Sequence, residues 1–116
     1  MMKEFIEKVK DNVIDLQRVE QIENVYKVSL PELAKHIISF KEKDMFFDDY
    51  RILSYEEILT ANEELHVPFT EERIIPFIDC MDNDFIVYDI DNKSWTKYNI
   101  VEKIKFGKIA DLEELA

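Results

Sequence analysis

The sequence predicts a single α+β domain in which N-terminal helices pack on an antiparallel sheet. The first part of the chain repeats apolar residues at the three- and four-residue spacing of helices. The second half contains β-branched and aromatic runs that alternate with polar residues. A length of 116 residues with 47% apolar content suffices for one hydrophobic core. We therefore expect residues 1–116 to form one domain, with a central helix on the sheet and a short C-terminal helix.

Residues 3–18 predict an amphipathic helix. Lys, Glu and Asp separate its apolar positions, which fall on one helical stripe: Phe5, Ile6, Val9, Val13 and Leu16. The next segment, VEQIENVYKV, is ambiguous, and we interpret it as a helix end or a loop.

The segment SLPELAKHIISF, residues 29–40, predicts the clearest helix of the chain. Ser29 can cap the first turn, where Pro31 is tolerated because that turn needs no backbone donor from it. The apolar residues follow at i, i+3, i+4, i+7 and i+8, and they are Leu30, Leu33, Ala34, Ile37 and Ile38.

The next part of the chain predicts a turn, a short strand and a second helix. The strand is expected near Tyr50–Leu53. Ser54 and Glu57 have the spacing of a capping box, so we expect a helix over about Tyr55–Leu65. The segment HVPFTEER then forms a connector that is broken at Pro68.

Residues 85–90 (FIVYDI) and 95–100 (WTKYNI) predict a β-hairpin, and Ile90 is expected to lie opposite Trp95. One face is almost wholly apolar and should meet the helices, with Phe85, Val87, Tyr98 and Ile100. The other face is amphipathic, with Ile86, Tyr88, Ile90, Trp95, Lys97 and Asn99. In the tail after Gly107, the segment ADLEEL predicts a short helix capped by Asp111.

The net charge of −11, from 26 acidic and 15 basic residues, limits the partners of this chain. It repels nucleic acid and acidic membranes, whereas it attracts a basic protein and also favours solubility. No apolar run is long enough to span a membrane, and the N-terminus does not have the pattern of a secretion signal. One cysteine cannot form a disulfide framework. We therefore expect a cytoplasmic protein that binds neither nucleic acid nor membrane directly.

The residue types that commonly perform catalysis are scarce. His36 lies inside a predicted helix, and His66 ends one, where a cation interacts favourably with the helix dipole. Cys80 lies beside Asp79 and Asp82, whose charges raise the pKa of a thiol and weaken its nucleophilicity. We expect no catalytic residue, no cofactor and no enzymatic activity.

The acidic residues cluster in the segment IIPFIDCMDNDFIVYDIDNKSW, residues 74–95, which holds Asp79, Asp82, Asp84, Asp89 and Asp91. A calcium loop needs a glycine turn and a closing glutamate, and this segment has neither, so we expect no metal. Turn formation explains part of the pattern, because Asp and Asn bond their own backbone. A partner-binding surface is the alternative, in which Tyr88 and Trp95 would be aromatic anchors beside the acidic residues.

Five segments in order, SLPELAKHIISF, YRILSYEEI, RIIPFID, FIVYDIDNKSW and DLEEL, resemble the SUKH superfamily, bacterial relatives of the yeast cell-wall-assembly regulator domain. The resemblance covers about residues 29–116. The chain departs from the family pattern at KEKDMF, where an Asn-Gly-Gly element is common, and at DCMDND, where a glycine-rich turn is common. Its C-terminal helix is also short. These departures indicate a divergent subfamily.

The resemblance implies a non-enzymatic immunity protein that binds and neutralises a cognate polymorphic toxin. Toxins of this kind are often nucleases, whose basic surfaces an acidic inhibitor can occupy. Its expected binding residues are Asp79, Asp82, Asp84, Tyr88, Asp89, Asp91 and Trp95. A regulatory or scaffold adaptor of the same fold, with a non-toxin partner, is the alternative. A small enzyme is a third alternative, which would need a site built from residues that we interpret as structural.

Overall fold

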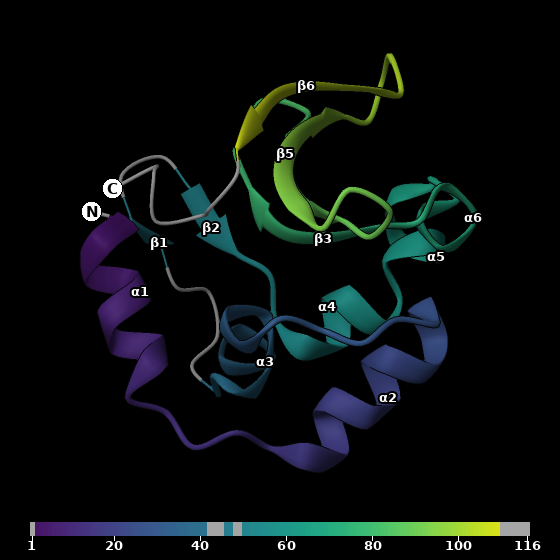
Figure 1. The fold of residues 1–116 in the computed structure, drawn as a ribbon. Helices are drawn as coiled ribbons and strands as arrows, with labels where there is room; N and C mark the ends of the chain where they lie inside the picture. Colours follow the sequence, from purple (N-terminus) through teal and green to yellow (C-terminus); the bar gives the residue numbers. More distant parts are fainter. Residues whose placement is uncertain (1, 42–45, 48–49, 110–116) are drawn as a thin grey trace.

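The computed structural model describes residues 2–41, 46–47 and 50–109. It confirms the α+β class, with helices packed around a six-stranded antiparallel sheet (Figure 1). The strands follow one another in sequence order, β1-β2-β3-β4-β5-β6. None of the helices within the described ranges has the length and apolar character needed to cross a bilayer.

The N-terminal part contains α1 (Met2–Lys10) and α2 (Leu16–Tyr26) in place of the single helix expected over residues 3–18. Asp15 causes the restart, because its side chain caps α2 by accepting from the Arg18 N–H at 3.3 Å. The break turns the predicted apolar stripe away from the core after Val9. Val13 and Leu16 are 86% and 72% exposed, and the ambiguous segment that follows is helical.

Helix α3 (Glu32–Ser39) confirms the predicted helix, and its Ala34, Ile37 and Ile38 are buried. The expected cap is wrong, because Pro31 occupies the N-cap position without a side-chain hydrogen bond. Glu23 of α2 reaches this segment instead and accepts from the Leu30 N–H at 2.8 Å.

Two short strands, β1 (Phe46–Phe47) and β2 (Tyr50–Ile52), precede three short helices. The Ser54–Glu57 capping box is confirmed and starts α4 (Tyr55–Leu59). The single helix expected to Leu65 is divided at Thr60, and α5 follows over Ala61–Leu65. The connector expected after it contains α6 (Phe69–Glu72).

The main sheet consists of β3 (Ile74–Asp79), β4 (Asp84–Asp89), β5 (Ser94–Asn99) and β6 (Ile104–Ile109). The sequence did not predict β6. The expected register is wrong by two residues, because Tyr88 and not Ile90 lies opposite Trp95. A two-residue shift keeps each side chain on its face, so the predicted faces remain correct. The expected helix at Asp111 lies outside the described residues.

Both faces of β4 are buried. On one face, the Tyr98 ring lies 6.2 Å from the ring of Phe69 in α6. On the other face, Trp95 packs against Phe77 and Tyr88 at 5.2 and 5.4 Å between ring centroids. The apolar part of the second face is therefore part of the core, whereas Lys97 and Asn99 on the same face are partly exposed as an amphipathic face requires.

Candidate functional site

The five aspartates of residues 74–95 lie at opposite ends of β4. Asp79, Asp82 and Asp84 flank the β3–β4 connection, and Asp89 and Asp91 flank the β4–β5 connection. A six-residue strand separates the two groups by about 17 Å at 3.4 Å per residue. Carboxylates that are close in the sequence are therefore separated in the fold. The prediction of a single acidic surface formed by all five aspartates is wrong.

At the first end, the connections formed by residues 80–83 and 100–103 lie side by side. The Ile100 N–H donates to the Asn83 carbonyl at 2.9 Å, and the Asn99 amide donates to Asp84 at 2.9 Å. Met81 and Val101 are 57% and 69% exposed on these connections. With the exposed Asp82 and Glu102 they form what we call the hairpin-end surface.

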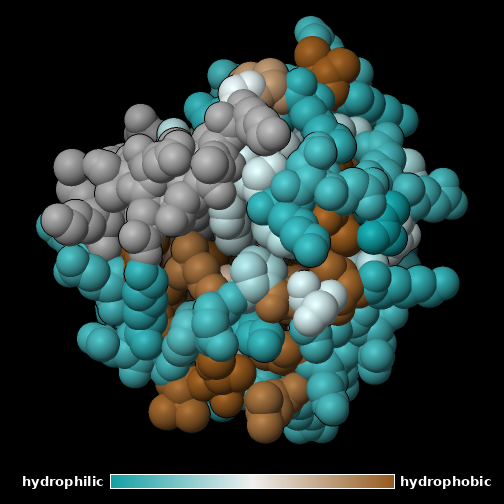
Figure 2. Space-filling model, in the orientation of Figure 1, coloured by the Kyte–Doolittle hydropathy of each residue, from teal (hydrophilic) through white to brown (hydrophobic). Residues whose placement is uncertain are grey.

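Figure 2 shows exposed apolar atoms among hydrophilic ones at the top of the molecule, where Figure 1 places the β5–β6 connection. The sequence pattern alone does not single out Met81 or Val101. The available signal was a single apolar residue inside a polar turn, as in CMDND and NIVEK. Such residues are common enough on surfaces that only their juxtaposition in the fold makes them informative.

Asp79 belongs to an ion-pair network beside a cavity of about 130 Å³. Arg51 makes two 2.9 Å hydrogen bonds to Glu57 and lies 3.7 Å from Asp79. Asp79 also accepts from the Met81 N–H at 2.8 Å. Burial raises the pKa of Glu57, but the hydrogen bonds from Arg51 and Ser54 hold it below its usual value. The network joins α4 to β2 and β3, so it explains Asp79 structurally.

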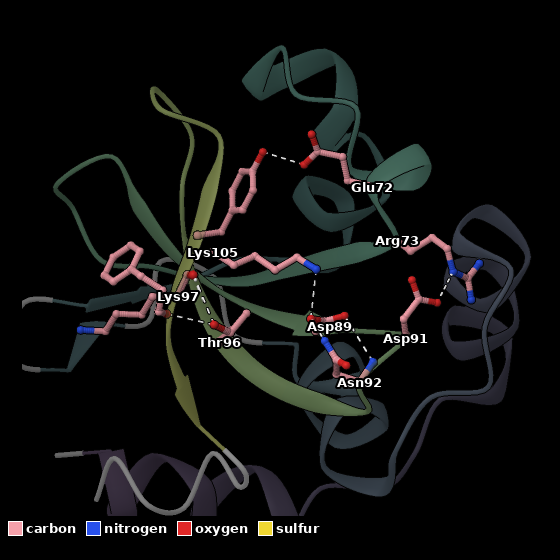
Figure 3. Close-up of polar contacts among 10 residues, drawn as sticks. Glu72, Arg73, Asp89, Asp91, Asn92, Thr96, Lys97 and Lys105 are labelled. Carbon is pink, nitrogen blue, oxygen red and sulfur yellow. Dashed lines mark hydrogen bonds and ion pairs between the residues drawn. The ribbon is translucent and has the colours of Figure 1, made fainter.

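At the second end, Asp89 is buried and its carboxylate is fully used (Figure 3). Asn92 donates to it through the backbone at 3.4 Å and the side-chain amide at 2.8 Å. Lys105 of β6 donates at 3.1 Å. Burial alone would raise the pKa of Asp89, but the bonds from Asn92 and Lys105 lower it below the usual value. Asp89 therefore closes the β4–β5 connection and holds β6.

The surroundings of Asp89 form an open pocket of about 260 Å³ on the sheet. Thr96 donates to the Phe106 carbonyl at 2.9 Å, and Asp91 accepts from Arg73 at 2.7 Å (Figure 3). Nearby, the Tyr98 hydroxyl donates to Glu72 at 2.6 Å. Each of these polar groups has a hydrogen-bond partner inside the protein, and these bonds stabilise the fold.

Tyr88 and Trp95 are 6% and 5% exposed, so neither ring is available as a surface anchor. Their position corrects the expected role, because the Trp95 ring packs edge-to-face against Phe77 and Tyr88 inside the core. Of the expected binding residues, Asp82 and Asp91 are exposed, and Asp79 and Asp84 are partly exposed. Only Asp82 combines exposure with the absence of a bonding partner among the residues that the structure describes.

The candidate nucleophile and bases have structural surroundings. Burial raises the pKa of Cys80 to about 11, with Asp84 and Asp79 adding to the effect and Lys97 opposing it. The sequence predicts that the acidic neighbours raise this pKa. It does not reveal burial, which is the larger cause, or the opposing effect of Lys97. His36 bonds the Asn12 carbonyl through Nδ1 at 2.9 Å, and the exposed His66 ends α5 as expected. Over the described ranges, no three His, Cys, Asp or Glu side chains are grouped to hold a metal.

No protein-family model matches the chain, and neither a curated protein nor a solved structure matches it.

Proposed function

We propose that this chain is a non-enzymatic immunity protein of the SUKH type that binds and neutralises a basic toxin domain, such as a nuclease. The hairpin-end surface carries the proposal, since its two adjacent connections combine exposed Met81 and Val101 with the exposed carboxylates of Asp82 and Glu102. Apolar side chains supply contact area and slow dissociation, whereas the surrounding charges raise the association rate. This composition suits a partner with an apolar patch inside a basic surface.

Two further observations support the proposal. The helix at Pro31, the strand at Tyr50, the capped helix at Ser54, the strand at Ile74 and the β4–β5 hairpin follow the order that the resemblance implies. The net charge of −11 favours a basic partner independently of that resemblance. Asp82 keeps its expected role in this proposal, while Met81 and Val101 replace Tyr88 and Trp95 as apolar anchors.

The experiment is co-expression with the product of the adjacent gene, followed by a pull-down and binding kinetics on the purified complex. We expect Asp82→Lys with Glu102→Lys to slow association, and Met81→Ser with Val101→Ser to speed dissociation. The matched control is Glu20→Lys with Glu71→Lys, at exposed positions of α2 and α6. Both double variants change the net charge from −11 to −7. A slower association in the first variant alone would therefore come from the hairpin-end surface and not from the total charge.

The proposal fails if the adjacent product does not bind, or if both reversals weaken binding equally. A complex with a cellular protein that is not a toxin, lost in the Met81 and Val101 variant, would instead identify a regulatory adaptor that uses the same surface.

A further inference from the structure

A groove of about 470 Å³ lies at the opposite end of β4 from the hairpin-end surface. Its walls are residues 27–31 and the β4–β5 connection. Figure 1 shows the first of these segments leading from α2 to α3. The Ile90 N–H donates to the Arg73 carbonyl at 3.0 Å and ties the second wall to the start of β3. The groove is formed by segments far apart in the sequence, so no local pattern reveals it.

The charge of this groove is opposite to that of the chain. Lys27, Arg73 and Lys93 line it, and no Asp or Glu does so among the described residues, although the chain has 26 acidic residues. Asp91 pairs with Arg73 through one nitrogen, Nε, at 2.7 Å. Lys27 and Lys93 have no ion-pair partner within the described ranges. By contrast, the cavity at Arg51 is also lined by Glu57 and Asp79, which form ion pairs with the Arg51 guanidinium.

The floor of the groove is apolar, with buried Leu30, Tyr88 and Ile90. Tyr88 also brings a hydroxyl for which the described residues offer no hydrogen-bond partner. The ring is packed in the core while the hydroxyl stays accessible, so this hydroxyl can donate to a ligand in the groove. Tyr88 is too buried to protrude as an anchor, but it can form part of the floor of the groove.

We propose that this groove binds an extended acidic peptide segment of a protein partner. An apolar side chain of the segment would lie on Leu30, Tyr88 and Ile90, and flanking carboxylates would meet Lys27, Lys93 and Arg73. A ligand without an apolar part would leave the floor unused. The groove is open, whereas sites for small molecules enclose most of the ligand surface, which favours a chain that crosses it. The net charge of −11 opposes every anion, but it opposes a polyanion such as nucleic acid more strongly than a short acidic segment, so the local cations and the apolar floor must supply the binding energy.

The site is separate from the hairpin-end surface and does not depend on the proposed function. Together the two surfaces would let the chain contact a basic and an acidic partner region at once, at opposite ends of the same strand.

The test measures fluorescence anisotropy of five fluorescein-labelled peptides of sequence EDXDE, with X as Leu, Ile, Phe, Tyr or Trp. We expect at least one to bind with a Kd of about 1 mM or tighter. The peptide with Gly at X should bind about fivefold more weakly, because it leaves the floor empty. Binding should weaken as salt is raised, since the cations are at the surface.

Variants locate the binding. Lys93→Glu should weaken it about fivefold. Lys103→Glu is the matched control, because Lys103 also occupies a left-handed position in a β-hairpin connection, with φ of 58° against 50°. It should bind within about twofold of the unaltered chain. Tyr88→Phe should weaken binding about threefold while the melting temperature stays unchanged, because the hydroxyl has no internal bond to lose.

Lys27→Gln tests the second lysine and should also weaken binding. Glutamine is used because a glutamate at the C-terminus of α2 would destabilise the helix through its dipole. The proposal is overturned if none of the five peptides binds, if Lys93→Glu and Lys103→Glu act equally, or if the Gly peptide binds as well as the others. Tighter binding of a labelled dodecathymidylate would show a nucleic-acid site and also overturn it.

Discussion

The ammonium group of Lys105 lies 3.1 Å from the buried carboxylate of Asp89, across the intervening strand β5. This pair links the last described strand to the β4–β5 connection (Figure 3). Breaking a buried pair costs more than the pair contributes, because the remaining charge is left without its partner.

Lys105→Met should lower the free energy of unfolding at pH 7 by about 1–3 kcal/mol, since Asn92 alone then supports the Asp89 carboxylate. The pKa of Asp89 is lowered in the folded state, so its contribution is present above the unfolded pKa, about 4, and is lost as the pH falls through the lower folded pKa. Urea unfolding of both proteins between pH 2 and 7 would measure this, and the difference should shrink at the acidic end. Lys103→Met, at an exposed position nearby, is the control. Equal unfolding curves for the two variants would contradict the assigned role of the pair.

Glu57 should contribute to stability in two separable ways. Glu57→Gln keeps an oxygen for the Ser54 N–H, now at 3.0 Å, but removes the charged pair with Arg51. Glu57→Ala removes both, and we expect it to cost about 1–2 kcal/mol more than Gln. Thermal unfolding by circular dichroism checks this order, and an equal loss in both variants would show that the cap contributes nothing.

Trp95 should behave as a core residue. Trp95→Ala should destabilise the fold by about 3–5 kcal/mol, and Trp95→Phe should cost less because it keeps an aromatic contact with Phe77. Because this is the only tryptophan, its emission should be shifted to the blue in the native protein and to the red on unfolding. Emission at the wavelength of a solvated indole under native conditions would restore the surface-anchor interpretation.

Val9 and Val13 provide a matched test of the helix break. Val9→Asp should prevent folding, because Val9 is completely buried. Val13→Asp should change stability by less than about 0.5 kcal/mol, because its side chain is on the surface. Urea midpoints measure both. A large loss at Val13 would indicate the continuous helix that the periodicity predicts.

The chain has seven described non-glycine residues with positive φ, four of them in the connections after β3, β4 and β5. Met81, Asn83, Lys93 and Lys103 take conformations for which glycine is the usual signal. With one glycine in the chain, a search for turns by glycine finds neither the 100–103 connection nor the strand that follows it. The missed turn is the reason that β6, Lys105 and the partner of Asp89 could not be predicted.

The sequence by itself determined the α+β class, the helix at Pro31, the Ser54–Glu57 capping box and which residues share each face of the β4–β5 hairpin. These features depend on residues within a few positions of one another. The tertiary structure alone decided that Trp95 is buried, that the aspartates separate to two ends of β4, and that three cations meet in one groove. The physical reason is that side-chain burial and charge balance depend on contacts between distant segments, and spacing along the chain does not encode which segments meet.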